Sequence, residues 1–446
     1  MTPPVVTRIT APADGLPPLR DTPASVAEVA GILARGHGPV AVDTERASSF
    51  RLDDRAFLIQ LRRAGSGTVL IDPETVPRET RGLATVMNGL PWVLHAAHTD
   101  LPCLVSLGWR PAELHDTQIA GKLLGLGQVG LAGMLEEMLG VTVAKDHGRD
   151  DWSRRPLGTD LLTYAALDVE LLLELHDEAR RRLDEAGRAG WYRQECSAVL
   201  ATAAHPVAVP GWRELKGVGA LTSPRSLALV QRLWYVRTVA AVGADRPPAT
   251  VLPTSDIIAV ASHPARARET LAAVLARPGR GRGRPDRRLT VFGTSLEEAL
   301  HRAVDDALGE DPAFLPVPFR SRGTAVPDHR TWREEYPLAA EISDGFRACA
   351  EDVAGDLGIG VDTLIVMKTL RSAAWTCATG AREVLLRDAR LRDPDVDSDP
   401  VGVLEDFVTS VLDQRGLRPW QCSLLAPGFV ATVADAVGGD PGAGLD

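Results

Sequence analysis

Apolar positions follow two different spacings along the chain, and this change divides it into regions. Short β-branched runs typical of strands occur at GPVAVDTE (38–45), AFLIQLRRAGSGTVLID (56–72) and PWVLHAAH (91–98). The middle segment contains a Gly/Ser turn between two apolar runs, which predicts an antiparallel hairpin. Strands are therefore expected in the first hundred residues.

Helical spacing takes over after residue 98. Segments with a 3.6-residue apolar period and a closing glycine predict four helices, at 99–108, 116–127, 131–140 and 159–187. The fourth is expected to be one long helix with Thr159 or Asp160 as its N-cap. Strands followed by helices predict an α/β domain.

The rest of the chain predicts helices alone. Periodic segments lie at 223–242, 253–262 and 265–276, and a further helical block spans about 336–435. A Gly/Arg/Pro run at 277–288 and a Pro-rich stretch at 311–330 have the composition of loops and linkers. We expect four regions, namely an α/β domain (1–205), a helical domain (206–310), a linker (311–335) and a second helical domain (336–446).

The distribution of charge along the chain is more informative than its net charge. The 446-residue chain has a net charge of −10, yet residues 206–290 hold 14 Lys/Arg against 5 Asp/Glu. A basic module on an acidic body is typical of nucleic-acid binding. The five cysteines form no C-x-x-C pair, which argues against zinc and disulfides. Without a secretion signal or an apolar run of about 18 residues, we expect a cytoplasmic protein with no membrane partner.

Acidic residues lie at the ends of the predicted strands. Asp43 and Glu45, two apart at a strand end, project from one face and would repel each other unless a cation lay between them. Asp100 follows another apolar run, and Tyr164 and Asp168 share one helix face. Carboxylates suit Mg²⁺ or Mn²⁺, which can activate water for phosphodiester cleavage. The alternative for the first pair is two surface acids at a strand end.

Several motifs in order resemble one family. VDTE, LHAAHTDL, LHDTQIAGKLL, DWSRRPL and YAALDVELL, within residues 25–190, resemble the ribonuclease D family, in the tyrosine-bearing (DEDDy) branch of the DEDD 3′-to-5′ exonucleases. The resemblance implies a ribonuclease H-like mixed sheet flanked by helices. It also implies that two divalent metal ions, Mg²⁺ or Mn²⁺, are held by four carboxylates and that a tyrosine orients the attacking water. The matching positions are Asp43, Glu45, Asp100 and Asp168 for the metals and Tyr164 for the water.

A second resemblance covers the basic region. WRELKGVGALTSPRSLALVQRLWYVRTVAA, DRPPATVL and SDIIAVAS resemble the HRDC domain, a helical nucleic-acid-binding module, and RPWQCSLLAP resembles the C-terminal helical domain of ribonuclease D. The resemblance implies phosphate contacts, and the alternative is ordinary solvated helix faces. The candidate residues are Lys216, Arg225, Arg232 and Arg237.

Two histidines and two arginines lie close in sequence to the acids or to Tyr164. His98 is expected to face the cleft, whereas His95 is expected in the core. Arg155, in the same motif as Asp150 and Trp152, either borders the substrate path or belongs to a packing motif at a helix start. Arg46 stands where an aromatic or small apolar residue is common in the family, which suggests a different environment for the scissile end.

Asp116 and the glycine-rich segment 125–130 follow Asp100 along the chain. Asp116 is expected to bond nearby backbone. GLGQVG (125–130) matches a dinucleotide fingerprint but follows a helix where that fingerprint needs a strand, so we expect an inter-helix loop and no nucleotide cofactor.

The predicted function is a metal-dependent 3′-to-5′ exoribonuclease that releases nucleoside 5′-monophosphates. Its expected partner is RNA with a free 3′ end, a tRNA precursor or another small structured RNA, and a monomer is expected. One alternative is a DNA exonuclease of the same superfamily, although no G-x-x-x-x-G-K-[ST] motif of a helicase accompanies the acids. A second alternative is a non-catalytic nucleic-acid-binding scaffold.

Overall fold

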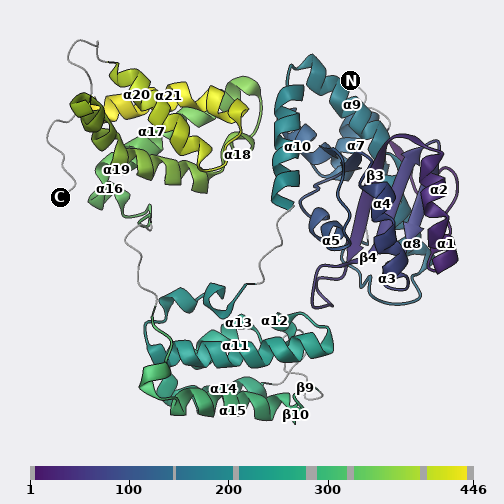
Figure 1. Ribbon diagram of the computed structural model, residues 1–446, viewed down its shortest axis with the longest axis horizontal. Coiled ribbons are helices and arrows are strands. Elements are labelled where there is room, and N and C mark those ends of the chain that lie inside the picture. Colours follow the sequence, from purple (N-terminus) through teal and green to yellow (C-terminus); the bar gives the residue numbers. More distant parts are fainter. Residues whose placement is uncertain are drawn as a thin grey trace.

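A computed structural model describes residues 6–143, 147–203, 210–277, 289–318, 326–391 and 399–438. The chain forms an α/β lobe at its N-terminal end and two helical lobes after it (Figure 1). This arrangement confirms the predicted fold class, an α/β exonuclease-like domain followed by helical domains. The predicted boundary at 205/206 and the Gly/Arg/Pro run beyond Arg277 lie outside the described residues.

The first lobe is built on a mixed six-stranded sheet with the strand order β2-β5-β4-β3-β6-β7. β4 pairs antiparallel with β3 and β5, whereas β6 is parallel to β3 and β7 is parallel to β6. The hairpin expected at 56–72 is confirmed as β4 and β5. The bounds are β2 (Leu19–Arg20), β3 (His37–Arg46), β4 (Ala56–Ala64), β5 (Gly67–Ile71), β6 (Trp92–Leu94) and β7 (Leu114–Asp116), with a separate parallel pair of β1 (Thr7–Ile9) and β8 (Val141–Val143).

Helices cover this sheet and bury its central strand, in which Val40, Ala41 and Val42 are fully inaccessible to solvent. The helices expected at 99–108, 116–127 and 131–140 are confirmed as α5, α6 and α7. The helices of this lobe are α1 (Pro23–Ala27), α2 (Val29–Ala34), α3 (Pro77–Gly82), α4 (Ala84–Met87), α5 (Leu101–Ser106), α6 (Thr117–Leu123), α7 (Leu131–Leu139), α8 (Thr159–Glu170), α9 (Leu172–Glu185) and α10 (Ala189–Ala203).

The single helix predicted at 159–187 is wrong in one respect, because the chain leaves helical geometry at Leu171 (φ −115°, ψ 13°). Both parts contact β3, but their other neighbours differ: α8 packs on β4 and β5, whereas α9 packs on α6, α7 and β6. A helix that covers both surfaces must bend between them. The N-cap is also not Thr159 or Asp160 but Gly158, whose backbone is extended.

The second lobe has its own hydrophobic core around the long helix α11. A two-residue hairpin, β9 paired with β10, was not predicted, and Phe292 and Gly293 at its turn both have positive φ. Such turns suit short hairpins, but strands of two residues leave no alternation to detect. The elements are α11 (Pro224–Ala244), α12 (Pro248–Val251), α13 (Thr254–Ser262), α14 (Ala267–Ala276), β9 (Thr290–Val291), β10 (Thr294–Ser295) and α15 (Leu296–Gly309).

The third lobe begins inside the segment expected to be a linker. Trp332 in α16 is buried, and its ring centroid lies 5.5 Å from that of Trp375.

Among the described helices, α21 is long and apolar enough to cross a membrane. It packs against α17 and α20, however, and buries Phe429 and Val433, as a core helix does. The helices are α16 (Trp332–Glu335), α17 (Pro337–Leu357), α18 (Val361–Leu364), α19 (Met367–Leu391), α20 (Pro400–Asp413) and α21 (Pro419–Gly438).

The first and third lobes are joined by packed side chains. The rings of Trp191 on α10 and Trp420 on α21 stack with centroids 4.8 Å apart. Beside them Arg418 Nε donates a 2.7 Å hydrogen bond to Glu195. The buried apolar residues of the two lobes form one continuous cluster as a result.

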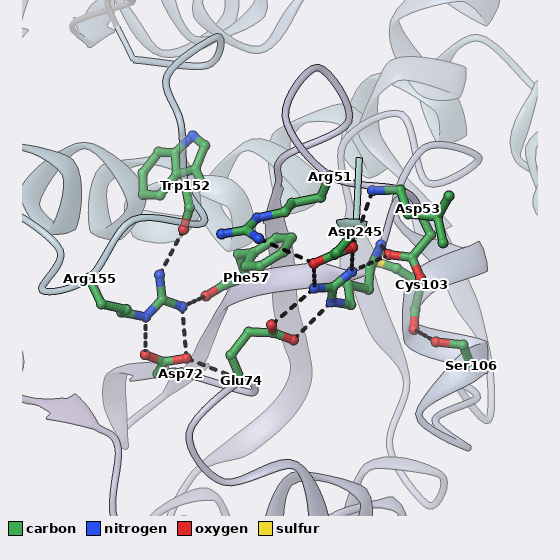
Figure 2. Close-up of polar contacts among 12 residues, drawn as sticks. Arg51, Asp53, Phe57, Asp72, Glu74, Cys103, Ser106, Trp152, Arg155 and Asp245 are labelled. Carbon is green, nitrogen blue, oxygen red and sulfur yellow. Dashed lines mark hydrogen bonds and ion pairs between the residues drawn. The ribbon is translucent and has the colours of Figure 1, made fainter. Parts of the chain in front are cut away.

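The second lobe meets the first through polar contacts to the loop between β3 and β4 (Figure 2). Arg55 donates to both carboxylate oxygens of Asp245, at 3.1 and 2.8 Å, and Arg51 donates to the same group at 3.3 Å. The backbone N–H of Leu52 also donates to Asp245, at 3.3 Å. Because this loop follows the C-terminal end of β3, the contact lies close in sequence to the predicted acidic site.

Candidate active site

Three of the four predicted carboxylates meet at the C-terminal end of β3. Asp43 and Glu45 come from the strand, and Asp168 comes from α8, which packs against it. One oxygen from each of the three lies within 4.8 Å of the others. Alternate strand positions point to one side, so the spacing of the first two acids and the packing of α8 together create the cluster.

The fourth carboxylate, Asp100, lines the same pocket of about 210 Å³ but is turned toward other partners. It accepts hydrogen bonds from Thr44 Oγ1 (2.6 Å) and Thr99 Oγ1 (2.8 Å). Arg46 Nη2 lies 3.7 Å from its Oδ1. The structure therefore brings all four acids to one pocket and three of them within mutual ligand distance.

Asp116 holds the turn that carries Asp100. Its carboxylate accepts from the backbone N–H groups of Ala96 (3.0 Å) and Ala97 (2.7 Å), and it also caps α6 at Gln118 (2.9 Å). Ala96 has a φ of 59°, a conformation that costs free energy for a residue with a side chain. The predicted backbone-bonding role of Asp116 is confirmed, and its effect is to fix a turn next to the acids.

Tyr164 lies one helical turn before Asp168 on α8, and both residues line the same pocket. The buried Trp152 packs at 6.2 Å from the Tyr164 ring, and His147 meets it edge-on at 5.7 Å. A Cβ added at Gly148 would lie 3.5 Å from the hydroxyl. These neighbours hold the ring with its hydroxyl at the pocket.

The electrostatics of the cluster favour a bound cation. Burial raises the pKa of Asp43 well above its usual value, and the charges of Asp100, Asp168 and Glu45 raise it further. Burial, and after it the charge of Asp168, raises the pKa of Glu45 to about 9. The pKa of Asp168 rises to about 7, mainly through burial. Ionising all of them needs positive charge nearby, and a set of carboxylate oxygens fits a hard divalent cation.

Arg155 makes polar contacts inside the protein, and its place beside the substrate path stays a prediction. Its guanidinium forms a bidentate pair with the buried Asp72, at 2.5 and 2.8 Å, and also donates to the carbonyl oxygens of Phe57 and Trp152 (Figure 2). These contacts fit the alternative, a packing motif at a helix start. The partner lies 83 residues away in the chain, so local pattern could not reveal it.

Two of the candidate phosphate contacts in the second lobe are likewise engaged inside the protein. Arg237 is buried and donates to Thr254, and Arg225 donates to the carbonyl oxygens of Ala307 and Glu310. Burial of Arg237 argues against a phosphate contact there, whereas the contact predicted for the partly exposed Arg225 stays a prediction. Arg225 lies against the C-terminal end of α15, whereas Arg237 lies at the junction of α12 and α13.

The remaining nucleic-acid candidates stay predictions. Arg232 pairs with Glu310 at 3.0 Å and is about half exposed, and Lys216 is exposed. His98 is exposed but does not line the acidic pocket, whereas His95 does, with Nδ1 2.9 Å from Thr117 Oγ1. The position of His95 partly departs from the prediction, because this half-buried histidine borders the site as well as the core.

Comparisons with known proteins agree with this geometry. Residues 21–184 match a family described as 3′-5′ exonuclease, and residues 325–398 match one described as 3′ to 5′ exonuclease C-terminal domain. A protein of Xanthomonas oryzae pv. oryzae named ribonuclease D is 35% identical over 170 residues, which cover 37% of this chain and 46% of that protein. One of the same name from Bartonella henselae is 25% identical over 355 residues, 78% of this chain and 82% of that protein.

The Xanthomonas protein and a ribonuclease D of Acidiphilium cryptum are each matched over only about half of their length, 46% and 54%. Solved structures extend the likeness. A protein from Bifidobacterium adolescentis superposes with a TM-score of 0.77 at 29% identity, covering 96% of this chain and 99% of that one. Escherichia coli RNase D, described as an exoribonuclease involved in structured RNA processing, gives a TM-score of 0.61 at 20% identity, covering 90% and 99%. This last likeness concerns the fold.

Proposed function

Because this chain is a member of the ribonuclease D family with a 3′-5′ exonuclease domain at residues 21–184, we propose that it is a metal-dependent exoribonuclease that removes nucleotides from the 3′ end of RNA. The observation that carries the proposal is the meeting of Asp43, Glu45 and Asp168, with oxygens within 4.8 Å, beside the hydroxyl of Tyr164.

Each side chain of the site has a defined part in this chemistry. Asp43, Glu45 and Asp168, with Asp100 beside them, would hold two divalent ions, Mg²⁺ or Mn²⁺. Bound there, the ions supply an acidified water and stabilise the leaving oxygen of the phosphodiester. In-line attack then leaves a 3′-hydroxyl end on the RNA and releases a nucleoside 5′-monophosphate.

Tyr164 suits the placing of the attacking water. Burial, and then the negative charges of Asp168 and Glu45, raise the pKa of its hydroxyl above the usual value. The hydroxyl therefore stays protonated at neutral pH and cannot act as the base. It can still hold a water molecule in line with the phosphate by hydrogen bonding.

The substrate we propose is a tRNA precursor or another small structured RNA with a free 3′ end. The basic second lobe supports this, since residues 206–290 carry 14 Lys/Arg against 5 Asp/Glu. We propose that the protein acts as a cytoplasmic monomer, in which the helical lobes hold the RNA while the first lobe trims it.

A trimming assay tests the proposal. RNA labelled at its 5′ end and bearing a single-stranded 3′ tail is incubated with the protein in Mg²⁺, in Mn²⁺ or in chelator, beside a DNA of the same sequence. The expected result is a metal-dependent ladder that shortens from the 3′ end and is lost with Asp168→Asn. Asp160→Asn, an exposed acid on the same helix, is the matched control and should leave the ladder unchanged.

The other outcomes separate the alternatives. Faster shortening of the DNA than of the RNA would make the protein a DNA exonuclease. Intact RNA in every lane, from folded protein that still binds it, would contradict catalysis and favour a binding scaffold.

A further inference from the structure

Arg46 places a positive charge inside the acidic pocket. It directly follows Glu45 at the end of β3, where the pairing with β4 shifts register and skips Phe57. Such a bulge bends a strand and re-aims the side chains next to it. Among the described residues that line the pocket, Arg46 is the one Lys or Arg.

The contacts of Arg46 leave much of its guanidinium available. Nη1 donates to the backbone oxygen of Thr99, and Nη2 lies 3.7 Å from Asp100 Oδ1, which is too long for a direct hydrogen bond. The side chain is 27% exposed, whereas the Asp100 side chain is 4% exposed. A guanidinium offers five N–H donors in a planar fork, so donors remain that can face the pocket.

Two roles are compatible with a cation at this place. It can be a structural clamp that holds the turn at Thr99 and Asp100, or it can bind an anion that enters the pocket. Nη1 bonds the Thr99 backbone as a clamp would, but Nη2, at 3.7 Å from Asp100 Oδ1, makes no direct hydrogen bond to Asp100 and can serve an anion. The fork of an arginine matches the oxygens of a phosphate group, which accept two parallel hydrogen bonds.

We propose that Arg46 is a substrate-binding residue that contacts the phosphate linking the 3′-terminal nucleotide to the rest of the RNA, on the Asp100 side of the pocket. The inference rests on the proposed function, because that phosphate is the one cleaved. After cleavage the same phosphate remains on the released nucleoside 5′-monophosphate. Arg46 therefore also contributes to the affinity for that product.

The test measures binding and not turnover. Calorimetric titrations with uridine 5′-monophosphate and with uridine, both in Ca²⁺, compare wild type with Arg46→Met. Charge-assisted hydrogen bonds contribute about 1.5–3 kcal/mol, so the variant should bind the nucleotide about 10- to 100-fold more weakly and bind uridine unchanged. Arg46→Lys, which keeps the charge without the fork, should lie between them. Arg35→Met, on the exposed end of α2, is the control.

A parallel Mn²⁺ titration separates the two roles. For an anion-binding arginine, Arg46→Met keeps or increases the affinity for Mn²⁺, because a competing positive charge is removed. Weaker Mn²⁺ binding together with an unchanged preference for the nucleotide over uridine would make Arg46 a clamp and overturn the proposal. The trimming assay on the wild type tests the proposed function separately. If the wild type trims RNA and Arg46→Met behaves as a clamp variant, only the inference about Arg46 fails.

Discussion

The role of Tyr164 can be tested by removing one atom, its hydroxyl oxygen. It lies beside Asp168, and aromatic neighbours hold its ring. We expect Tyr164→Phe to lower kcat about 10²-fold, near the lower end of the range for a positioned proton-bearing group, with the affinity for Mn²⁺ unchanged. Steady-state kinetics on RNA measures this. Tyr235→Phe, an exposed tyrosine on α11, is the control, and an equal loss in both variants would contradict the role.

The raised pKa values of the acids predict how pH affects the metal-free protein. In the folded state Asp168 has a pKa of about 7 and Glu45 of about 9, against 3.8 and 4.5 as ordinary values. The folded protein therefore keeps protons that the unfolded chain has released. The free energy of unfolding then falls as pH rises from about 4 to about 9.

Thermal melts in chelator at pH 5 and pH 8 measure this effect. The wild type should lose more melting temperature between these values than Asp168→Asn does, and Mg²⁺ should restore part of the loss at pH 8. Identical pH profiles for the two proteins would show that the acids are not under electrostatic strain.

Residue-level prediction from sequence succeeded where the determinants are local. Asp43 and Glu45 are two apart on one strand, and Tyr164 and Asp168 are one helical turn apart, so spacing alone shows which side chains share a face. The pairing of Arg155 with Asp72 joins two distant segments. Spacing cannot detect such a pair, so the sequence did not reveal the partner of Arg155.

At the scale of elements, the loop GLGQVG is a second place, besides α10 and α21, where the first lobe contacts the third. Gly125 has a φ of +73°, and a Cβ there would collide with the carbonyl oxygen of Gly358. Arg188 bridges the same place by donating to the carbonyl oxygens of Leu123 (2.5 Å) and Leu357 (2.6 Å). The predicted inter-helix loop is confirmed, and its first glycine is required for a contact between lobes.

Alanine substitutions in this loop test whether Gly125 itself is required or whether the loop tolerates alanine at any glycine. Gly125→Ala forces a side chain into left-handed geometry, at a cost of about 1–2 kcal/mol, and adds the collision. Gly127→Ala, two residues on, meets nothing within 4 Å and should be close to neutral. Urea unfolding measures both, and equal stability of the two variants would contradict the contact.

Periodicity predicted most elements but not their ends. The break at Leu171 depends on α8 and α9 packing against different neighbours, and a continuous 3.6-residue pattern does not record that change. The β9–β10 hairpin was missed because each strand has two residues. Tertiary packing decided both cases, and a single sequence shows only the period.

At the scale of the whole molecule, the lobes are held together by different forces. The first and third share buried apolar residues, whereas the contact of the first with the second includes ion pairs from Arg51 and Arg55 to Asp245. Salt screens exposed ion pairs and leaves apolar packing intact. The composition of the chain predicted the succession of regions but not which lobes share a core.

This difference predicts a salt-sensitive joint between the first and second lobes. Asp245→Asn keeps a residue that tolerates the positive φ of 49° at the end of α11 but removes the charge. Small-angle X-ray scattering should show a larger radius of gyration for the variant at low salt, and the wild type should approach it as NaCl rises. A wild-type radius independent of salt would contradict the ionic joint.

The proposed activity depends on the binding of divalent metal by Asp43, Glu45 and Asp168. The most direct measurement is anomalous diffraction from crystals grown with Mn²⁺ and uridine 5′-monophosphate. We expect anomalous peaks bonded to oxygens of these three side chains, and their loss in Asp168→Asn. Fully occupied nucleotide with no anomalous peak at the three carboxylates would contradict it.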